Sequence, residues 1–280
     1  MPPFIFFGTD EFAVGVLDEL VAHEWLPQVI VTTPDQPAGR KLLLTPPPVK
    51  TWAEHRGITV LQPENLRDPE LAQHLKSANF ALFIVAAYGK IIPPTILELP
   101  AYGTLNIHPS LLPKYRGPSP LQSAILQGDQ ETGVSIMKLD EQMDHGPILA
   151  QNSCQLSPVG FEELRDKLAK LGAELLVKIV PDYLARKITL TEQDHARATY
   201  TKKFTKADAE IKLREAPELN YRKILALNPN PGTWLIDADG TRLKVLSAHL
   251  ENDELKFDRV IPEGKKEMEW ESYLRGQNKH

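Results

Sequence analysis

The 280-residue chain contains a single cysteine, Cys154. One thiol excludes an intrachain disulfide and any metal site built from several cysteines. Disulfides are rare in reducing compartments, so this scarcity favours a cytoplasmic protein. The eight histidines form neither an HExxH nor an HxxxH pair, so the sequence carries no zinc signature and we expect no metal.

Long hydrophobic runs are also absent. The longest, ALFIVAAYG (81–89), is far shorter than the roughly 20 residues that a membrane-spanning helix needs. The opening MPPFIFFGTD has no basic segment and only a short apolar run, unlike a signal peptide. Both observations predict a cytoplasmic protein with no membrane contact. No heptad pattern is present either, so we expect a monomer.

Positive charge is scarce overall, since the formal net charge is -5. Residues 1–195 hold 16 Lys and Arg against 23 Asp and Glu, whereas residues 196–280 hold 16 against 14. The C-terminal part is therefore the better suited to a polyanionic partner. Charge alone does not decide whether it binds one.

The N-terminal pattern alternates strands and helices. FIFF (4–7), followed by Gly8, is typical of a buried strand. Residues 11–25 repeat apolar side chains at helical spacing, and Asp10 before them can cap that helix. QVIVTT (28–33) predicts a second strand. This order predicts an α/β fold, a Rossmann-like, mostly parallel sheet with helices on both faces. Further strands are expected at 58–63, 81–89, 103–109, 132–140 and 148–156, and helices at 49–57, 66–80, 119–128 and 161–187.

Composition changes divide the chain into three parts. Residues 1–188 form the predicted catalytic domain, 189–204 are polar and aperiodic like a linker, and 205–280 contain short strand-like runs typical of a small OB-like β-barrel. Within the first part, residues 34–50 hold five prolines and predict a long functional loop. The first strand–helix turn, FFGTDEF, lacks the three glycines of a dinucleotide site, so we expect no NAD.

The segment TLNIHPSLLPKYRGPSP (104–120) carries the most chemical information. Asn106 and His108 are two residues apart on an expected strand, so both point to one face. Asp144 follows in a second loop, LDEQMDHG. Each residue alone is typical of a turn or an ordinary packed side chain. Together, at strand ends, an amide, an imidazole and a carboxylate suit a transferase that stabilises an oxyanion and moves a proton.

Several motifs resemble the formyltransferases that use 10-formyltetrahydrofolate. These motifs are FFGTDEFAV, PDQPAGR, LTPPPVK, VAAYGKIIP, NIHPSLLPKYRGPSP and ETGVSIMKLDEQMDHG, and the later LNPNPGTW and PEGKKEMEWESYLRG resemble the C-terminal domain of the methionyl-tRNA formyltransferases. The resemblance implies transfer of a formyl group from the folate to the amino group of methionyl initiator tRNA. It implies that Asn106 and His108 stabilise the tetrahedral intermediate, and that Asp144 orients His108.

The resemblance also implies binding residues. Folate contacts are expected from the SLLP loop and from the end of the preceding strand, namely Ser110, Leu111, Leu112, Pro113, Tyr88 and Gly89. In the proline-rich loop, Arg40 and Lys41 are the expected tRNA contacts. For Arg116, contact with a phosphate, contact with the folate glutamate and capping of a helix all remain open.

Some positions depart from the family pattern. Gln36 stands where the family's loop has an arginine, and one or two of that loop's lysines are also lost, which weakens the attraction for tRNA. Residues 251–260 bridge a gap where family members have further strands, so we expect an abbreviated C-terminal barrel. Two alternatives remain: a sugar-nucleotide N-formyltransferase with the same chemistry, disfavoured by the proline loop and the PEGKK segment, and a non-catalytic RNA-binding module.

Overall fold

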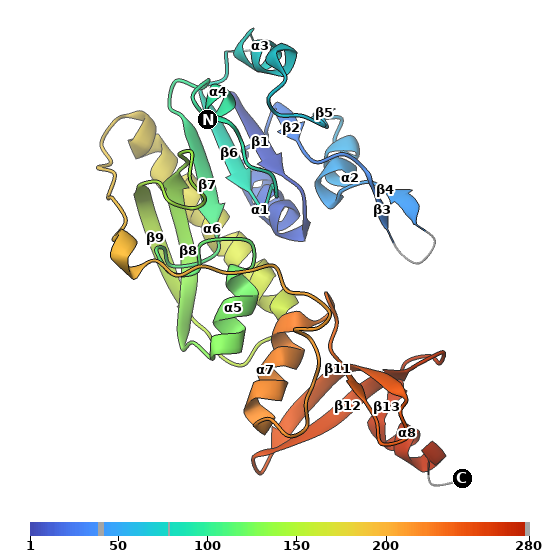
Figure 1. Ribbon diagram of the computed structural model, residues 1–280. Coiled ribbons are helices and arrows are strands. Elements are labelled where there is room, and N and C mark those ends of the chain that lie inside the picture. The colour runs from blue at the N-terminus through green and yellow to red at the C-terminus, as the bar shows by residue number, and fades with distance from the viewer. Residues whose placement is uncertain (39–41, 78, 278–280) are drawn as a thin grey trace. The chain divides into compact units, whose positions relative to one another are not determined.

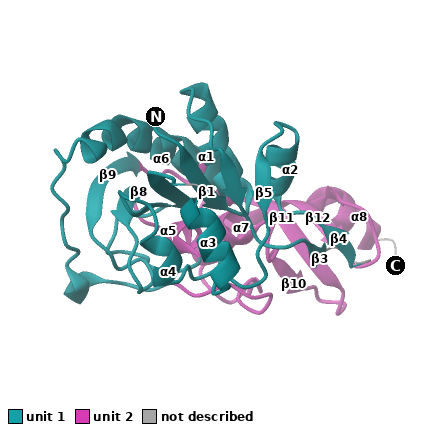
Figure 2. Cartoon of the chain, turned by 90° about the horizontal axis from the view of Figure 1, so that it is seen from above, with its two compact units in different colours: residues 1–118, 133–154, 165–200 teal, residues 119–132, 155–164, 201–280 magenta. Residues whose placement is uncertain are grey.

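The computed structural model describes residues 1–38, 42–77 and 79–277. Two compact units divide the chain, each assembled from separated segments (Figure 2). Unit 1 contains residues 1–118, 133–154 and 165–200, and unit 2 contains residues 119–132, 155–164 and 201–280. Of the predicted linker, residues 189–200 therefore lie in unit 1 and residues 201–204 in unit 2.

A seven-stranded sheet organises the N-terminal part (Figure 1). Its order is β5-β2-β1-β6-β7-β8-β9. The first five strands in that order pair in parallel, and β8 is antiparallel to β7. The predicted mostly parallel sheet is confirmed. The bounds are β1 Phe4–Gly8, β2 Val29–Val31, β5 Thr59–Leu61, β6 Leu82–Ala86, β7 Thr104–His108, β8 Glu131–Lys138 and β9 Ile148–Gln155.

Helices connect these strands. The carboxylate of Asp10 caps α1 by accepting hydrogen bonds from the backbone N–H of Phe12 (3.0 Å) and Ala13 (3.3 Å), as its sequence position predicted. Gly8 is required before this cap, because a Cβ there would lie 2.7 Å from the Cβ of Ala13. The helices are α1 Glu11–Ala22, α2 Pro48–Glu54, α3 Pro69–Ser77, α4 Pro94–Leu97, α5 Pro120–Gln127 and α6 Phe161–Leu184.

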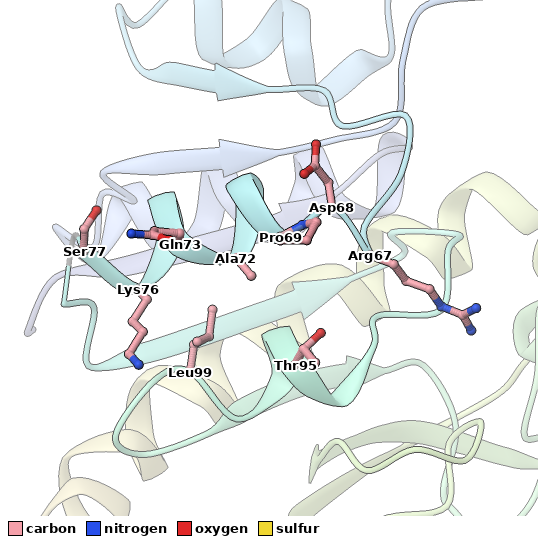
Figure 3. A pocket seen from close by; sticks show the side chains of 9 residues that line it. All are labelled: Arg67, Asp68, Pro69, Ala72, Gln73, Lys76, Ser77, Thr95 and Leu99. Atoms are coloured by element: carbon pink, nitrogen blue, oxygen red, sulfur yellow. The ribbon is translucent and has the colours of Figure 1, made fainter.

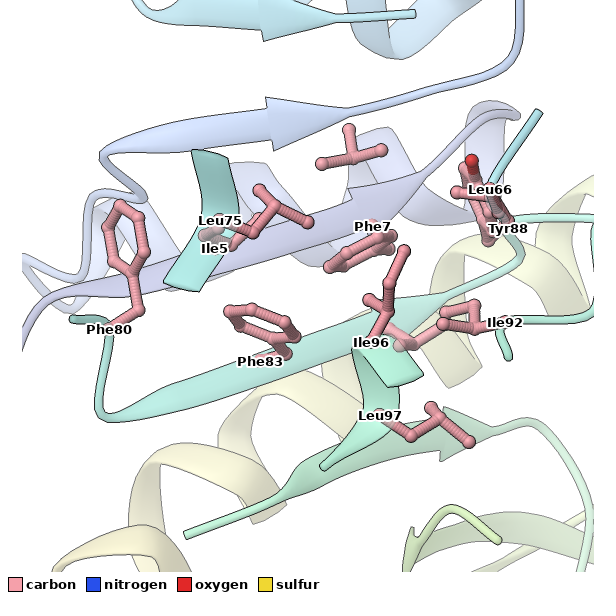
Figure 4. Packing of buried hydrophobic residues seen from close by; sticks show 12 residues of the cluster. Ile5, Phe7, Leu66, Leu75, Phe80, Phe83, Tyr88, Ile92, Ile96 and Leu97 are labelled. Carbon is pink, nitrogen blue, oxygen red and sulfur yellow. The ribbon is translucent and has the colours of Figure 1, made fainter. Parts of the chain in front are cut away.

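Apolar side chains of α3 and α4 cover one face of the sheet (Figure 4). Leu75 and Ile96 pack there with Ile5, Phe7 and Phe83, and the rings of Phe7 and Phe83 lie 5.4 Å apart. Alternation along β1 and β6 explains this set, since residues two apart share a face. The remaining members of the cluster are Val31, Leu66, Phe80, Val85, Tyr88, Ile92 and Leu97.

Helix α6 lies against β7 on the opposite face. A Cβ on Gly172 would come within 2.5 Å of Cγ2 of Ile107, so only glycine allows this close approach. Asn106 and His108 flank Ile107 along the strand and therefore point to the other face. Strand pairing sets Asn106 opposite Val85, on the face covered by α3 and α4.

The proline-rich segment 34–50 is more regular than predicted. Instead of a continuous loop, β3 (Gln36–Ala38) and β4 (Leu43–Thr45) form an antiparallel hairpin, and α2 follows at Pro48. Prolines are compatible with an isolated two-stranded ribbon because its outer edges need no ladder hydrogen bonds. The expectation of an irregular loop was therefore wrong. The helices α4 and α8 (Trp270–Gln277) and strand β13 (Met268–Glu269) were also not predicted.

Unit 2 contains a second sheet, with order β10-β11-β12-β13 and antiparallel pairing throughout. A barrel was predicted here, and the strands are confirmed. An OB-type barrel closes with five strands, whereas the described residues supply four that form a sheet. The remaining elements are β10 Trp234–Ile236, β11 Arg242–Glu251, β12 Glu254–Pro262 and α7 Pro217–Leu227. Buried Leu235, Leu243, Val245, Val260 and Tyr273 form its core with Ile211 and Ile224.

No helix in residues 1–38, 42–77 and 79–277 combines the length and the apolarity needed to cross a bilayer.

Candidate active site

The carboxyl end of β7 presents the two strand residues of the predicted site. Asn106 and His108 are both buried, with 8% and 4% of their surface exposed. In open α/β sheets, ligands bind at the carboxyl ends of the parallel strands. The parallel partner β6 ends at Ala86, so the segment after it begins at the same edge of the sheet.

The structure brings His108 and Asp144 together. Nδ1 of His108 lies 3.5 Å from Oδ1 of Asp144, and the side chains are 5% and 12% exposed. Nε2 of His108 donates a hydrogen bond to the backbone carbonyl of Tyr115 at 3.0 Å. Because a carbonyl only accepts, this contact requires a hydrogen on Nε2, and Nδ1 is the ring nitrogen that faces Asp144.

The loop around Asp144 holds its carboxylate in place. Oδ2 accepts a hydrogen bond from the backbone N–H of Gly117 at 2.7 Å. Asp144 adopts a left-handed conformation with φ of 52°, which is uncommon for a residue other than glycine. Such a conformation persists where the surrounding contacts enforce it.

The side-chain amide of Asn106 has an unusual environment. The residue is only 8% exposed and its amide makes no hydrogen bond to another described residue, but the amide is not among the fully enclosed polar atoms, so it remains open to solvent. An amide that bonds to no protein group and is still open to solvent can be reached by a ligand, and a hydrogen bond to it then displaces only water. An unpartnered amide beside the His108–Asp144 pair is therefore a good candidate for ligand contact.

The expected folate loop, residues 110–113, is mostly engaged within the protein. The Ser110 hydroxyl donates to the carbonyl of Lys114 at 2.6 Å, so it is not free for a ligand. Leu112 is buried, whereas Leu111 and Pro113 are partly exposed. Ser135 on β8 supports this loop by donating to the carbonyl of Ser110 and accepting from the N–H of Leu112.

The other two expected folate residues, Tyr88 and Gly89, follow β6. The Tyr88 ring packs edge-on against Phe7 at 5.5 Å and is 2% exposed, and burial raises its pKa to about 12. Its hydroxyl has no hydrogen-bond partner among the described residues. Gly89 adopts φ of 80°, a conformation that favours glycine. Gly89 can offer a ligand only backbone groups, whereas the carbonyl of Tyr88 already accepts from the hydroxyl of Thr9 at 2.8 Å.

The expected tRNA contacts Arg40 and Lys41 lie outside the described residues. Next to them, the hairpin carries three exposed leucines, with 71%, 64% and 70% of Leu42, Leu43 and Leu44 accessible. Its base is anchored, because Lys50 contacts both carboxylate oxygens of Asp35 at 2.9 Å. These contacts lower the pKa of Asp35, for which the hydrogen bond from Gln62 is the largest cause and that from Lys50 the next.

The sequence analysis missed the residues that support this site. Gln193 lies in the segment interpreted as a linker, yet it is only 5% exposed and donates to the carbonyls of Asp144 and Gly146. Arg116 is 1% exposed and its guanidinium bonds to Gln193, so it is engaged within the protein. Neither burial is visible in the polarity pattern, because it depends on contacts across 77 positions.

Two surface hollows lie near the same sheet. A hollow of about 760 Å³ between α3 and α4 is lined by residues such as Arg67, Lys76 and Leu99 (Figure 3), and none of the predicted catalytic residues lines it. A smaller hollow of about 530 Å³ includes Ile91 and Glu141, which belong to the segment after β6 and to the loop that bears Asp144. The smaller hollow is therefore nearer to the expected folate residues.

Metal ligands are not grouped in the part of the chain that the structure describes. No cluster of three or more His, Cys, Asp or Glu side chains there could hold a metal ion.

Comparisons with known proteins identify the family. Residues 3–180 match the formyl transferase family. The chain is 46% identical to a methionyl-tRNA formyltransferase of Chloroflexus aggregans over 245 residues, which are 87% of this chain and 79% of that protein. It is 37% identical to a methionyl-tRNA formyltransferase of Halalkalibacterium halodurans over 299 residues, 97% of this chain and 94% of that protein.

Solved structures share the fold. A methionyl-tRNA formyltransferase from Clostridium thermocellum matches with a TM-score of 0.63 and 18% identity, covering 94% of this chain and 99% of that one. HypX from Aquifex aeolicus in complex with tetrahydrofolic acid matches with a TM-score of 0.69 and 14% identity, covering 98% of this chain and 47% of that one. The family match, the relatives and the fold agree, and the chain belongs to the methionyl-tRNA formyltransferases, enzymes of the formyl transferase family.

Proposed function

We propose that this enzyme transfers the formyl group of 10-formyltetrahydrofolate to the α-amino group of methionyl initiator tRNA, with Asn106, His108 and Asp144 as its catalytic residues. The observation that carries the proposal is the buried His108–Asp144 pair, with Asn106 two positions earlier on the same strand and its amide bonded to no other described residue. The names of the relatives support the acceptor, and the HypX complex supports a folate donor.

Asn106 supplies a hydrogen-bond donor for the reacting oxygen. When the amine attacks the formyl carbon, the carbonyl oxygen gains negative charge. An amide held in a buried site stabilises that charge without reorganisation, and one such donor contributes roughly 3–4 kcal/mol. The Asn106 amide bonds to no other described residue. No hydrogen bond within these residues therefore has to break before the amide donates to the reacting oxygen.

His108, assisted by Asp144, transfers one proton during the reaction. As the new C–N bond forms, the attacking amine must lose a proton, and the folate nitrogen must gain one as its bond to the formyl carbon breaks. With Nε2 held by Tyr115, the Nδ1 lone pair of His108 accepts the first proton and returns it to the leaving nitrogen. Asp144, 3.5 Å away, stabilises the imidazolium that exists between the two transfers.

The binding residues follow the same edge of the sheet. We infer that the folate contacts the loop of Ser110, Leu111, Leu112 and Pro113 and the backbone of Tyr88 and Gly89. Apolar walls with a few polar groups suit a pterin-bearing ligand. The Ser110 hydroxyl is already bonded to Lys114, so its contribution would come through the backbone. Arg40 and Lys41 are proposed as phosphate contacts of the acceptor end of the tRNA.

The decisive experiment compares three acceptors with one donor. Purified enzyme receives 10-formyltetrahydrofolate together with methionyl initiator tRNA, free methionine or an amino-sugar nucleotide. We expect rapid formylation of the charged tRNA and little of the other two. Efficient use of the amino sugar would support a sugar-nucleotide N-formyltransferase. Binding of a 10-formyl folate analogue, followed as a thermal shift, distinguishes both from an RNA-binding module without catalysis.

A further inference from the structure

A ten-residue segment borders the candidate site although its sequence resembles a linker. We call residues 191–200 the strap. Its first residue pairs with Ile148, since each backbone N–H donates to the other's carbonyl at 2.8–2.9 Å. At its end, Arg116 N–H donates to the carbonyl of Thr199 at 2.8 Å. Both ends of the strap are therefore tied to backbone near the site.

Gln193 is the buried residue of the strap, and Arg116 fixes its orientation. Nη2 and Nε of Arg116 donate to Oε1 of Gln193 at 2.7 and 3.2 Å. Because a guanidinium has only donors, the amide oxygen of Gln193 must face Arg116. The amide nitrogen then faces the opposite way, where it donates to the carbonyl of Asp144 at 3.0 Å and to that of Gly146 at 2.7 Å.

Arg116 is itself fixed on several sides. Its Nη2 also donates to Nδ1 of His195 at 2.9 Å, and its Nη1 donates to the hydroxyl of Tyr200 at 3.3 Å. The rings of His195 and His145 stack at 4.1 Å, which adds a contact directly after Asp144. A fully buried arginine with directed partners orients neighbouring groups more rigidly than a flexible surface side chain does.

The turn that carries Asp144 needs such support. Asp144 has φ of 52°, so its backbone is in a region that L-residues avoid. Gln193 bonds to the carbonyl of Asp144 itself and to that of Gly146, two positions later, and so holds both sides of this turn. The carboxylate of Asp144 extends from the same strained residue toward His108. A small rotation of the turn would therefore move the carboxylate away from the imidazole.

We propose that Gln193, oriented by Arg116, is a positioning residue that sets the Asp144 carboxylate for proton transfer at His108. This inference rests on the catalytic role proposed above for Asp144. Gln193 touches neither substrate nor reacting atom, and its effect is transmitted through the Asp144 backbone. Its loss slows the chemical step while substrate binding is largely retained.

Two substitutions of Gln193 test the proposal. Gln193→Glu keeps an acceptor for Arg116 but has no N–H for the two carbonyls, and Gln193→Met keeps the shape without either function. We expect kcat to fall about 10- to 100-fold in both variants, the range expected for misplacement of a catalytic group, with each KM changed less than about 3-fold. The matched control is Glu192→Gln, an exposed neighbour, which should retain wild-type kinetics.

A double-mutant cycle separates positioning from packing. If Gln193 acts through Asp144, then adding Gln193→Met to Asp144→Asn should lower kcat by less than about 2-fold, because contacting residues of one network are not additive. If the losses in kcat of the two single variants multiply in the double variant, the positioning role of Gln193 is refuted. It is also refuted if both Gln193 variants keep wild-type kcat while Asp144→Asn is impaired. In either case the catalytic role of Asp144 stands. Wild-type kcat in Asp144→Asn would instead refute the proposed catalytic set, and the inference with it. Melting curves verify that each variant is folded.

Discussion

Asn106 is mostly buried, yet its side-chain amide bonds to no other described residue and is not among the fully enclosed polar atoms, so it stays open to solvent or a ligand. A neighbouring position, Thr104, differs, since its buried hydroxyl donates to the carbonyl of Leu97 at 2.9 Å. Thr104 and Asn106 lie on the same strand, so comparing them distinguishes a residue that stabilises the fold from one that acts on a ligand. The pairing of Thr104 stabilises the fold, whereas the unpaired Asn106 is available to a ligand.

We expect Asn106→Ala to lower kcat by about 10²- to 10³-fold, the usual cost of removing one oxyanion donor. The melting temperature should stay the same or rise, because no protein hydrogen bond is lost among the described residues. Steady-state kinetics and thermal unfolding measure both effects. Thr104→Ala is the control and should show the opposite pattern, with lower stability and nearly unchanged kcat. A stable Asn106→Ala enzyme with normal kcat would contradict the proposed oxyanion contact.

For Asp144, two substitutions separate charge from loop support. Asp144→Asn removes the charge but keeps an oxygen that accepts from Gly117, whereas Asp144→Ala loses both. We expect kcat to fall about 100-fold or more in each, as for a general acid–base group, and the melting temperature to fall clearly only in the alanine variant. His108→Ala should also abolish most turnover. Near-wild-type rates in either His108→Ala or Asp144→Asn would exclude the proton path through this pair.

At the scale of elements, the hairpin β3–β4 combines a fixed base with three exposed leucines, Leu42, Leu43 and Leu44. Asp35, Lys50 and Gln62 fasten the base, since Gln62 donates to Asp35 at 2.7 Å and Lys50 bonds to both its oxygens. The three leucines beyond it are exposed and contribute little to the core. Exposed leucines at this density mark a binding surface more often than a stabilising one.

The double substitution Leu43→Ser with Leu44→Ser should change stability by less than about 0.5 kcal/mol, as for exposed positions. If the hairpin meets the acceptor end of the tRNA, KM for charged tRNA should rise several-fold while KM for the folate stays constant. Arg40→Ala should act in the same direction through the lost phosphate contact. Leu26→Ser, at another exposed leucine of the same unit, is the control. Unchanged KM for tRNA in all variants would show that the hairpin does not bind it.

In unit 2, the turn at 205–208 is held by one carboxylate. Asp208 pairs with Lys202 and accepts from the N–H of Thr205 at 2.8 Å. The hydrogen bond from Lys202, followed by the backbone bond from Thr205, lowers the pKa of Asp208 to about 2. A folded pKa below the unfolded value stabilises the native state at pH values above the unfolded pKa, and this contribution is lost as pH falls through the folded pKa.

Asp208→Asn should therefore lower the free energy of unfolding by about 1 kcal/mol at pH 7, a value reduced for solvent screening. The difference from wild type should shrink between about pH 4 and pH 2, where the unfolded carboxylate is protonated first. Urea unfolding at several pH values measures it. Asp253→Asn, in an exposed turn, should show no comparable difference. A pH-independent loss in Asp208→Asn would indicate that the charge does not contribute.

At the scale of the whole molecule, the charge distribution limits how tRNA is bound. The C-terminal 85 residues have only two more basic than acidic residues, and the rest of the chain is acidic. The enzyme is therefore expected to neutralise few phosphates. If about two are neutralised, kcat/KM for charged tRNA should fall roughly ten-fold between 50 and 200 mM salt. Assays over this range test it, and a hundred-fold fall would indicate a larger basic surface than the composition allows.

Much of this architecture could be predicted because it depends on local pattern. The buried runs of β1 and β6, the cap at Asp10 and the amphipathic α6 were all predicted from residues close in sequence. The hairpin in the proline-rich segment was not, because residue preferences there disfavour strands and only cross-strand pairing overrides them. The short helix α8 and strand β13 carry too few periodic residues to be recognised.

The sequence by itself determined the family, the mostly parallel sheet and the neighbouring positions of Asn106 and His108, because these depend on motifs and on the two-residue period of a strand. Only the tertiary structure decided that Asp144 lies against His108 and that Gln193 and Arg116 are buried behind it. Those contacts join residues up to 77 positions apart. Polar side chains at such separations carry no periodic signal, so their burial is decided by how the strands and loops pack.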